Sequence, residues 1–450
     1  MMNEFRPVGI CWLLAVAVVF SLAAEGMEPL DPSPITVYRS ADGRISPRSP
    51  GILRLDDGRL IVTMEYDQGG MKKVPGVGKT PDGKIYRGRA LVSDDGGQNF
   101  RETGSFPLYQ GRPFTAGKRL YVLGHYNDLG IVFSEDRCET WSEVAWLSQG
   151  QDWHQAPCNV HYAHDRVYLV MERHKVPMRD LWPVFSIAPV VMSAPVGADL
   201  TQCSSWVFSN EISYTEMAKQ EGAAPSSIGV PFYPIGPTVE GKSLLDAKML
   251  RSRPMAPLGW LETHIVTFTD PDHLWYDPED RTMYLWMRAH TGTTNYACIA
   301  KAVEHADRSI VVEAARAPSG QPMLYVPCPG GHLKFHILYD QQSKLYWLAS
   351  NQSTDSMTRP DRLPESRYAL PDNERHRLVL HFSKNCIDWC FAGLIDKTDD
   401  PRQARSYPAM AFDGDDLLVL SRSGDENAKN AHDANLLLLH RIRNFRGLVY

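Results

Sequence analysis

The stretch YPAMAFDGDDLLVLSRS at residues 407–423 contains a short apolar segment, a polar turn rich in Asp and Gly, and a second segment rich in Leu and Val. Two such segments on either side of a turn predict a β-hairpin. The same unit recurs along the chain, and its other copies are SPGILRLDDGRLIVTME (49–65), RPFTAGKRLYVLGHY (112–126), NVHYAHDRVYLVMER (159–173), HLWYDPEDRTMYLWMRA (273–289) and HLKFHILYDQQSKLYWLASN (332–351). Repetition of one hairpin indicates a fold built from equivalent units.

The spacing of these hairpins predicts the kind of repeat. Their turns lie roughly 50 to 70 residues apart, with one gap of about 115 residues between the third and fourth units, and such periods in an all-β chain indicate a β-propeller. We therefore expect six four-stranded antiparallel blades around a central channel. The long gap predicts an insertion at about residues 215–257, where Pro and Gly are frequent. A seventh blade hidden in this gap is the alternative.

The composition is that of a globular protein. The 450 residues are 43% apolar, 22% charged and 10% aromatic, which argues against disordered, collagen-like and coiled-coil chains. The formal net charge is -6 and no Lys/Arg block occurs. This gives no electrostatic footprint for nucleic acid or for an anionic membrane, so a cationic site must be local.

The first residues have the features of a targeting segment. Residues 10–24 form an uncharged apolar run after Arg6, and small residues end it. We interpret residues 1–24 as a secretory signal peptide, which predicts a secreted or periplasmic protein. An uncleaved N-terminal anchor is the alternative. No later stretch approaches about 20 apolar residues, so residues 25–450 are expected to form a single propeller domain without a membrane span.

The cysteines do not form a recognisable framework. Seven follow the expected leader: Cys138, Cys158, Cys203, Cys298, Cys328, Cys386 and Cys390. Their odd number and wide spacing argue against a disulfide scaffold, and the pair Cys386 and Cys390 is interpreted as strand residues beside a turn rather than as zinc ligands. Phosphate-binding loops, His-Glu-x-x-His sequences and nucleophile elbows are also missing from the sequence. We expect neither a metal nor a cofactor.

The hairpins predict where a site would form. The start of the first strand and the end of the second lie at the same end of an antiparallel pair, so these ends should converge around one mouth of the channel. Arg, His, Tyr and carboxylates gather there, and they include Arg48, Glu65, His125, Tyr126, Glu172, His174, His273, Arg288, His290, His332, Tyr407 and Arg422. Arginines bind carboxylates through paired hydrogen bonds, so an acidic ligand is expected. Solvated rim residues and internal ion pairs, such as Arg288 with Asp272, are the alternative.

Three turns carry a second pattern: SDDGGQNF (93–100), SEDRCETW (134–141) and SKNCIDWC (383–390). In each, Ser precedes Asp or Asn, and these side chains can bond the backbone of the turn. The turns resemble the Asp boxes (BNR repeats), S-x-D-x-G-x-T-W, of the sialidase (neuraminidase) superfamily. The third keeps only Ser383 and Trp389 of that pattern. Because the boxes are structural in that family, the resemblance implies the propeller fold.

The resemblance also implies an activity, that of an exo-glycosidase (glycoside hydrolase) which removes sialic acid or a related terminal acidic sugar. Sialidases hold the substrate carboxylate with three arginines. The sequence Arg-Ser-Pro at 48–50 resembles the Arg-Ile-Pro motif of the first arginine, and Arg288 resembles the second. Arg375, ahead of the third box, resembles the third arginine, and Arg377 competes for this role.

Sialidases use a Tyr nucleophile, and the segment 406–420 is similar to the one that carries it, which implies this role for Tyr407. Asp67 is the nearest match to the acid/base. The carboxylate that activates the nucleophile should lie about one hairpin before Arg288, where Asp272 is the candidate. Glu65, at a strand end, completes the catalytic candidates.

Two other functions stay open. The His-rich mouth also suits a propeller-type polysaccharide lyase that acts on uronate-containing polymers, in which Arg or His neutralises the carboxylate and His or Tyr transfers protons. The degenerate boxes favour a non-catalytic glycan-binding propeller. All three functions predict an acidic glycan or polysaccharide as the partner.

Overall fold

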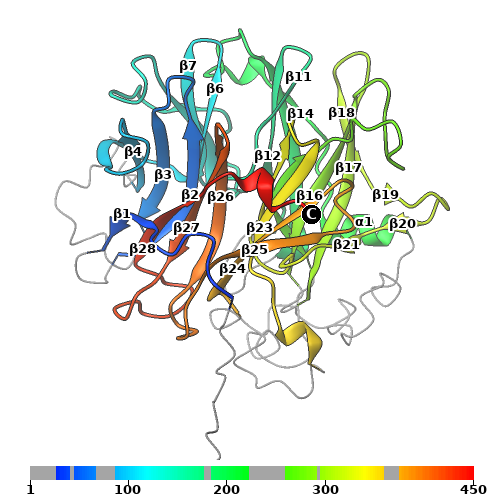
Figure 1. Cartoon of the computed structure of the whole chain (residues 1–450). Helices are drawn as coiled ribbons and strands as arrows, with labels where there is room; N and C mark the ends of the chain where they lie inside the picture. The colour runs from blue at the N-terminus through cyan, green and yellow to red at the C-terminus, as the bar shows by residue number, and fades with distance from the viewer. Residues whose placement is uncertain are drawn as a thin grey trace, which may run out of the picture.

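The computed structural model describes residues 27–40, 45–66, 87–176, 184–221, 259–290, 294–358 and 374–450. The expected signal peptide at 1–24, the acid/base candidate Asp67 and most of the expected insertion at 215–257 lie outside the described residues. Within these residues the chain forms six antiparallel blades of a β-propeller, numbered I to VI in chain order of their first strands (Figure 1). The prediction of an all-β, six-bladed propeller is confirmed.

The first three blades use consecutive strands. Blade I consists of β2 (Pro47–Arg54), β3 (Leu60–Tyr66), β4 (Gly88–Ser93) and β5 (Arg101–Phe106). Blade II consists of β6 (Tyr109–Ala116), β7 (Arg119–Tyr126), β8 (Asp128–Ser134) and β9 (Ala145–Trp146). In blade III the innermost strand is split into β10 (Trp153–His154) and β11 (His161–Ala163), both paired with β12 (Arg166–His174), and β13 (Ile187–Pro195) and β14 (Val207–Phe208) follow.

The other three blades complete the ring. Blade IV consists of β15 (Trp260–Val266), β16 (Thr282–Ala289), β17 (Tyr296–Glu304) and β18 (Ile310–Glu313), and β21 (Tyr325–Pro327) also pairs with β17. Blade V consists of β22 (His336–Asp340), β23 (Leu345–Ser350), β24 (Arg377–Ser383) and β25 (Cys390–Lys397). Blade VI consists of β26 (Arg405–Asp413), β27 (Asp416–Ser423), β28 (Leu436–Ile442) and β1 (Ile35–Arg39).

Few other elements occur in the described part of the chain. They are the ribbon of β19 (Ala315–Arg316) and β20 (Pro322–Met323), the helix α1 (Tyr214–Gln220) and the 3-10 turns Val184–Ser186, Cys203–Ser205, Asp355–Met357 and Phe445–Leu448. Helix α1 begins with a capping box in which Ser213 and Glu216 bond each other's backbone N–H. No described helix combines the length and apolar character needed to cross a membrane.

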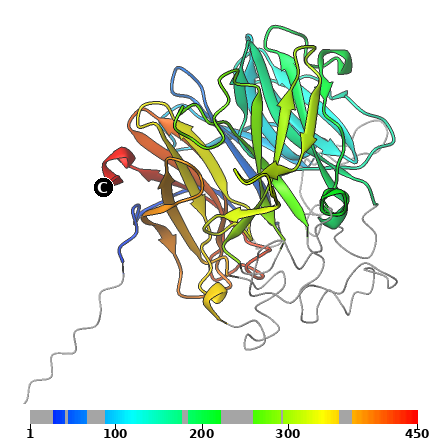
Figure 2. The same cartoon turned by 90° about the vertical axis from the view of Figure 1, so that its right-hand side faces the viewer.

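The ring is closed by strands from opposite ends of the chain. β1 pairs antiparallel with β28, with Ile35 opposite Leu439 and Arg39 opposite Leu436. Figure 2 shows the blue N-terminal segment beside the orange and red blade that ends the chain. Ring closure therefore joins strands from near the two ends of the chain.

The core lies between the blades rather than inside any one sheet. On β3, whose seven residues are all buried, Ile61 packs with Val122 of blade II, whereas its neighbour Val62 packs with Leu420 of blade VI. Strands buried on both faces are apolar throughout, which explains the unbroken runs in the hairpin units. Each neighbouring pair of blades encloses one such cluster.

The three serine-containing turns form the backbone contacts expected of them. In the first, Ser93 Oγ donates to Asp95 Oδ1 at 2.7 Å and accepts from the N–H of Gly97 at 2.8 Å. Asp95 Oδ1 also accepts from the N–H of Asn99 at 3.0 Å. The equivalent bonds link Ser134 with Asp136 and Ser383 with Asn385. The seven described cysteines are all free thiols.

One expected hairpin forms differently. The partner of β16 is β15, not a strand that begins at His273. Residues 267–281 connect the two strands at the end opposite the mouth, and Asp277 Oδ2 accepts from the N–H groups of Arg281 and Thr282 at 3.0 and 2.9 Å. Asp and Pro in this connection favour a turn, whereas the seven residues of β15 are all buried.

Two candidate residues are consequently far from the mouth. Asp272 is exposed in the connection. His273 stacks on Phe268 with ring centroids 3.7 Å apart, and its Nε2 contacts the carbonyl of Asn385 at 3.2 Å. The structure therefore contradicts the placement of both residues at the mouth, and it does not support an ion pair between Asp272 and Arg288.

Candidate active site at the propeller mouth

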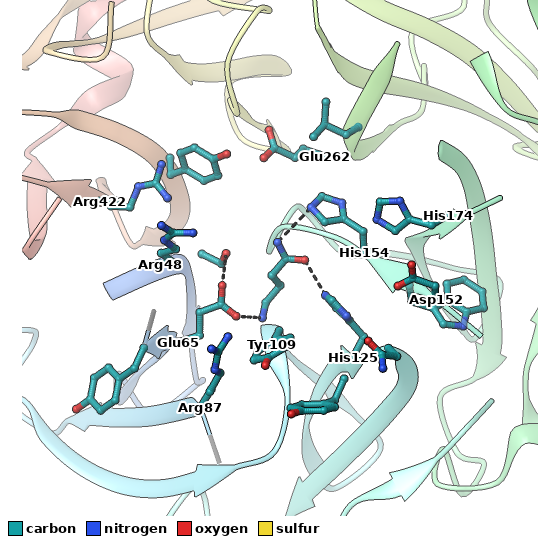
Figure 3. Close-up of a pocket in the computed structure, with 18 of the residues that line it drawn as sticks. Arg48, Glu65, Arg87, Tyr109, His125, Asp152, His154, His174, Glu262 and Arg422 are labelled. Atoms are coloured by element: carbon teal, nitrogen blue, oxygen red, sulfur yellow. Dashed lines mark hydrogen bonds between the residues drawn. The ribbon is translucent and has the colours of Figure 1, made fainter. Parts of the chain in front are cut away.

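The open ends of the blades surround a cavity of about 580 Å³ (Figure 3). It lies where first strands begin and second strands end. Of the predicted residues, those that line it are Arg48, Glu65, His125, Tyr126, His174, Arg288, Tyr407 and Arg422. Figure 3 shows Arg48 and Arg422 on one side of the cavity and His125, His154 and His174 on the other.

We call these sides the arginine half and the histidine half. The arginine half comprises Arg48, Glu262, Arg288, Tyr407 and Arg422, from blades I, IV and VI. The histidine half comprises Gln110, His125, Tyr126, His154 and His174, from blades II and III.

Four innermost strands share one backbone irregularity at the cavity. In each, the pairing register shifts around a non-glycine residue with positive φ, and these residues are Ser49 (48°), Gln110 (52°), Glu262 (60°) and Tyr407 (54°). All four line the cavity. A β-bulge re-aims a side chain, and a left-handed non-glycine residue costs of order 1–3 kcal/mol. The fold therefore concentrates backbone strain where it aims these four side chains.

Tyr407 lies at the centre of the arginine half. Arg288 Nη1 donates to the Tyr407 hydroxyl at 3.1 Å and to Glu262 Oε2 at 3.3 Å. Arg288 Nε donates to the carbonyl of His332 at 2.9 Å, so His332 fixes the guanidinium from behind. Burial disfavours the charge of Arg288, but Glu262 and Tyr407 more than offset it and raise the pKa of this arginine. The Tyr407 hydroxyl and the Glu262 carboxylate therefore both accept from Nη1 of Arg288.

Two further arginines flank the Tyr407 ring. The guanidinium carbon of Arg422 lies 3.9 Å from the ring centroid and that of Arg375 lies 5.8 Å from it. Arg422 lines the cavity and is 2% exposed, yet its Nε and Nη2 have no hydrogen-bond partner among the described residues. Burial lowers the pKa of both arginines, that of Arg375 to about 9. Hydrogen bonds from an anionic ligand would stabilise a buried guanidinium whose nitrogens lack partners.

Arg48 completes the arginine half. Its Nη2 donates to Asp433 Oδ1 at 2.7 Å, and Nδ1 of His432 contacts the same oxygen at 2.9 Å. The hydrogen bond from His432, together with the charge of Arg48, lowers the pKa of Asp433. Asp433 therefore stays ionised and orients Arg48 at the edge of the cavity.

The histidine half is organised by a buried carboxylate. Glu172, 1% exposed, accepts from the N–H and hydroxyl of Thr263 at 3.0 and 2.9 Å, and its other oxygen lies 2.6 Å from Nδ1 of His154. Since a carboxylate only accepts, His154 donates through Nδ1. The amide nitrogen of Gln110 contacts Nε2 of His154 at 3.2 Å.

The network continues through Gln110 to the next histidine. The Gln110 side-chain oxygen accepts from Nε2 of His125 at 2.8 Å and from the N–H of Gln155 at 2.9 Å. Burial, with the neighbouring His154 and His174, lowers the pKa of His125 well below its usual range. Burial and His154 also lower the pKa of His174 to about 3. Both histidines are therefore neutral near pH 7.

Glu65 lies between the two halves. Its oxygens accept from the Ser49 hydroxyl at 3.2 Å and from the N–H of Gln110 at 2.8 Å, so two of the bulged residues hold it. Glu65 is 8% exposed, and burial raises its pKa. A carboxyl group with a raised pKa in a cavity has the properties of a general acid.

The remaining predicted residues lie behind or outside the cavity wall. Glu172 is behind His154, Arg375 is behind Tyr407, and His332 is behind Arg288. His290 is half-buried and does not line the cavity. Asp67 is outside the described residues.

Sequence reasoning missed several residues of the site. Glu262 was missed because β15 was not recognised as the first strand of its hairpin, although a Glu inside the apolar run WLETHIV (260–266) was a usable signal. His154 was missed because the innermost strand of blade III is split and resembles no other unit. Gln110 precedes the recognised start of its unit and gave no signal of its own.

Known proteins share the fold but little of the sequence. No family model and no curated protein matches the chain. A protein of unknown function from Dyadobacter fermentans is 9% identical over 91% of this chain and 98% of its own, with a TM-score of 0.50. Penicillium chrysogenum alpha-L-arabinanase complexed with arabinobiose is 11% identical over 94% of this chain and 100% of its own, with a TM-score of 0.46. Trypanosoma rangeli sialidase in complex with the inhibitor DANA is 10% identical over 94% of this chain and 59% of its own, with a TM-score of 0.48. At these identities the likeness is one of fold.

Proposed function

We propose that the cavity is the active site of a retaining glycoside hydrolase which removes a terminal sugar bearing a carboxylate, such as sialic acid. The observation that carries this proposal is the shared contact of Tyr407 and Glu262 with Arg288 Nη1, at 3.1 and 3.3 Å, beside Arg422, whose Nε and Nη2 have no partner among the described residues. Export by the leader at 1–24 and a single domain over 25–450 belong to the same proposal.

The arginine half would bind the substrate carboxylate. Arg48, Arg288 and Arg422 all line the cavity, whereas Arg375 is fully buried behind the Tyr407 ring. We therefore assign the third carboxylate contact to Arg422 and give Arg375 a supporting role. Paired N–H donors of guanidinium match the two oxygens of a carboxylate.

Tyr407 would act as the nucleophile. A carboxylate nucleophile is repelled by an anionic sugar, whereas a phenol is neutral until it loses its proton. In the first step the Tyr407 oxygen bonds to the anomeric carbon and its proton passes to Glu262, directly or through one water. The glycosidic C–O bond breaks, and a general acid protonates the leaving oxygen. Water then attacks the anomeric carbon of the glycosyl-enzyme and gives its proton to the deprotonated general acid. The bond from the anomeric carbon to the Tyr407 oxygen breaks, and Glu262 returns its proton to Tyr407.

Two carboxyl groups compete for the role of general acid. The resemblance to sialidases implies Asp67. Glu65, two residues earlier, lines the cavity and has a raised pKa. Replacing each by its amide and measuring turnover of substrates with good and poor leaving groups separates them, because loss of the acid harms only the poor leaving group.

Tyr407→Phe tests the assignment of the nucleophile. We expect turnover of an aryl sialoside to fall about 10³-fold or more, as for other nucleophile replacements. Tyr126→Phe is the matched control, since this tyrosine lines the histidine half. Equal activities of the two variants on an acidic sugar that the parent protein cleaves would exclude Tyr407 as the nucleophile.

One observation favours a second candidate function, that of a polysaccharide lyase for uronate polymers. His154 lines the same cavity with its Nδ1 held by the buried Glu172, an arrangement that supports a general base. Lyase products absorb ultraviolet light through a new C=C bond, so the two reactions are easily distinguished. In the lyase case His154→Gln would abolish activity. Glycan binding without cleavage in both assays would favour a non-catalytic propeller.

A further inference from the structure

Cationic and imidazole side chains gather around the propeller axis below the cavity. Two of them lie two residues further along the innermost strands than the residues that line it. Arg112 follows Gln110 on β6, and His264 follows Glu262 on β15, each by two residues. Lys334 and His336 lie at the start of the innermost strand of blade V. These four residues are almost fully buried, with exposed fractions of 1% for Arg112, 0% for His264, 1% for Lys334 and 4% for His336.

Packing and hydrogen bonds hold three members of this group together. The rings of His264 and His336 lie 5.0 Å apart, centroid to centroid. Nδ1 of His336 accepts from the N–H of Met410 at 2.9 Å, so its proton is on Nε2. Lys334 Nζ donates to the carbonyl of Pro408, the residue after Tyr407. Blades IV, V and VI therefore meet at this point.

Arg112 links blade II to blade III, and burial together with the charge of Arg112 lowers the pKa of His264, Lys334 and His336. Its Nη2 donates to the carbonyls of Ala156 and Val170 at 3.1 and 3.0 Å. Its Nε and Nη1, and both ring nitrogens of His264, are buried without a hydrogen-bond partner in the described ranges. Burial lowers the pKa of Arg112, but an arginine is charged near pH 7, so this guanidinium is a cation in the interior.

The nearby carboxylates do not satisfy these donors. Both oxygens of Glu172 are engaged by Thr263 and His154, and Glu262 bonds Arg288. Within the described residues no ion pair reaches Arg112 or Lys334. Burial lowers the pKa of Lys334 to about 8, and burial together with the charge of Lys334 lowers the pKa of His264 and His336. The group therefore presents several hydrogen-bond donors and positive charge. The hydrogen-bond acceptor in it is the ring nitrogen of His264 that carries no proton.

We propose that this axial cluster of Arg112, His264, Lys334 and His336 binds a monovalent anion of halide size. Donors without acceptors, around a fixed positive charge, select an anion over a cation. The exposed fractions of 4% or less exclude a sugar or polymer as the ligand. The anion would link the strands that carry Glu262 and Tyr407 and stabilise the folded ring.

Bromide locates such a site directly. Crystals of the full chain soaked in sodium bromide should show an anomalous peak on the axis, within hydrogen-bond distance of Arg112 Nε or Nη1. A water molecule at this position without an anomalous signal would overturn the proposal, and so would a bromide peak confined to the cavity beside Arg422.

Thermal unfolding tests the same site in solution. In chloride, compared with the bulky anion gluconate at equal ionic strength, we expect Tm to rise by about 1–3 °C for each tenfold increase in concentration above the dissociation constant. Arg112→Gln should abolish this difference. Arg166→Gln is the control, because Arg166 bonds Ser193 away from the axis; it should lower Tm equally in both salts. Identical Tm values of the parent protein in chloride and gluconate would overturn the proposal. The bromide experiment uses the parent protein and decides the matter even where Arg112→Gln does not fold.

Discussion

The two halves of the cavity differ in how their buried polar groups are hydrogen-bonded. In the histidine half hydrogen bonds within the protein run from Glu172 through His154 and Gln110 to His125, whose Nδ1 has no partner among the described residues. In the arginine half Arg422 is almost fully buried, and two of its nitrogens have no partner among the described residues. A network whose groups are mostly paired depends less on a ligand than a buried charge with two unpaired nitrogens does. For the acidic sugar of the proposed function, we therefore expect the charged part to bind in the arginine half and an uncharged part in the histidine half.

The largest expected effect concerns binding of a charged substrate. Arg422→Met should lower kcat/KM for the acidic sugar by about 10²–10³-fold, because a buried charge-assisted contact is lost. His174→Asn, in the histidine half, should lower it less than about tenfold, because a neutral contact contributes far less than a charge-assisted one. The measurement is steady-state kinetics on the acidic sugar and on its neutral methyl ester. Equal losses on acid and ester would contradict a carboxylate contact at Arg422.

The next effect concerns stability of the histidine half. Glu172→Ala leaves His154 and Thr263 without their acceptor, and we expect the free energy of unfolding to fall by about 2–4 kcal/mol. Urea unfolding measures this. Val62→Ala removes only apolar contacts between blades I and VI and should leave the tautomer of His154 unchanged in NMR spectra. A fall below about 0.5 kcal/mol for Glu172→Ala would show that the network is not bonded as described.

A third effect is the pH dependence of stability. The pKa of His174 is lowered to about 3 in the folded chain, so the unfolded chain binds the proton more readily. Stability is therefore lost as the pH falls below the ordinary histidine value of about 6.5, by up to about 1.4 kcal/mol per pH unit for one fully neutral histidine. His174→Asn should flatten the acid side of a plot of Tm against pH. An unchanged slope would mean that His174 is protonated in the folded protein.

The smallest expected effect is a gain in stability. Arg422→Met removes a desolvated charge while its side chain can still cover the Tyr407 ring, so we expect the free energy of unfolding to rise by about 1 kcal/mol. Calorimetry in the absence of substrate measures it. Arg48→Met is the control, because it removes a charged donor to Asp433 and should destabilise the protein. Destabilisation by Arg422→Met would mean that this guanidinium is satisfied in the free protein.

The repeated hairpin made the fold predictable, because alternation of apolar strands and Asp/Gly turns is a local property of the sequence. The site was predictable only where strand pairing was inferred correctly. For blades I and VI the strand ends placed Arg48, Glu65, Tyr407 and Arg422 in one cavity. In blade IV the aromatic residues of the connecting segment resemble a strand, so Asp272 was chosen and Glu262 was not.

Backbone irregularities were the least predictable part. A bulge at Gln110 depends on how β6 pairs with β7 and on the packing around it, and no residue type marks it in advance. Glycine would have signalled a positive φ, but the four bulged positions at the cavity are Ser, Gln, Glu and Tyr. Tertiary contacts impose this conformation, so sequence patterns could not reveal which side chains are aimed into the cavity.

The closure of the ring by β1 and β28 sets an order of assembly for the two halves. Blades II and III are neighbours in the sequence, so the histidine half can form from contacts of short range as the chain emerges. Arg48 meets Arg422 only when blade I docks against blade VI, and blade VI is complete only when β1, made first, pairs with β28, made almost last. Contacts of such long range form slowly. We therefore expect the charged half of the cavity to form late in folding, and a chain truncated before Leu436 to lose it first.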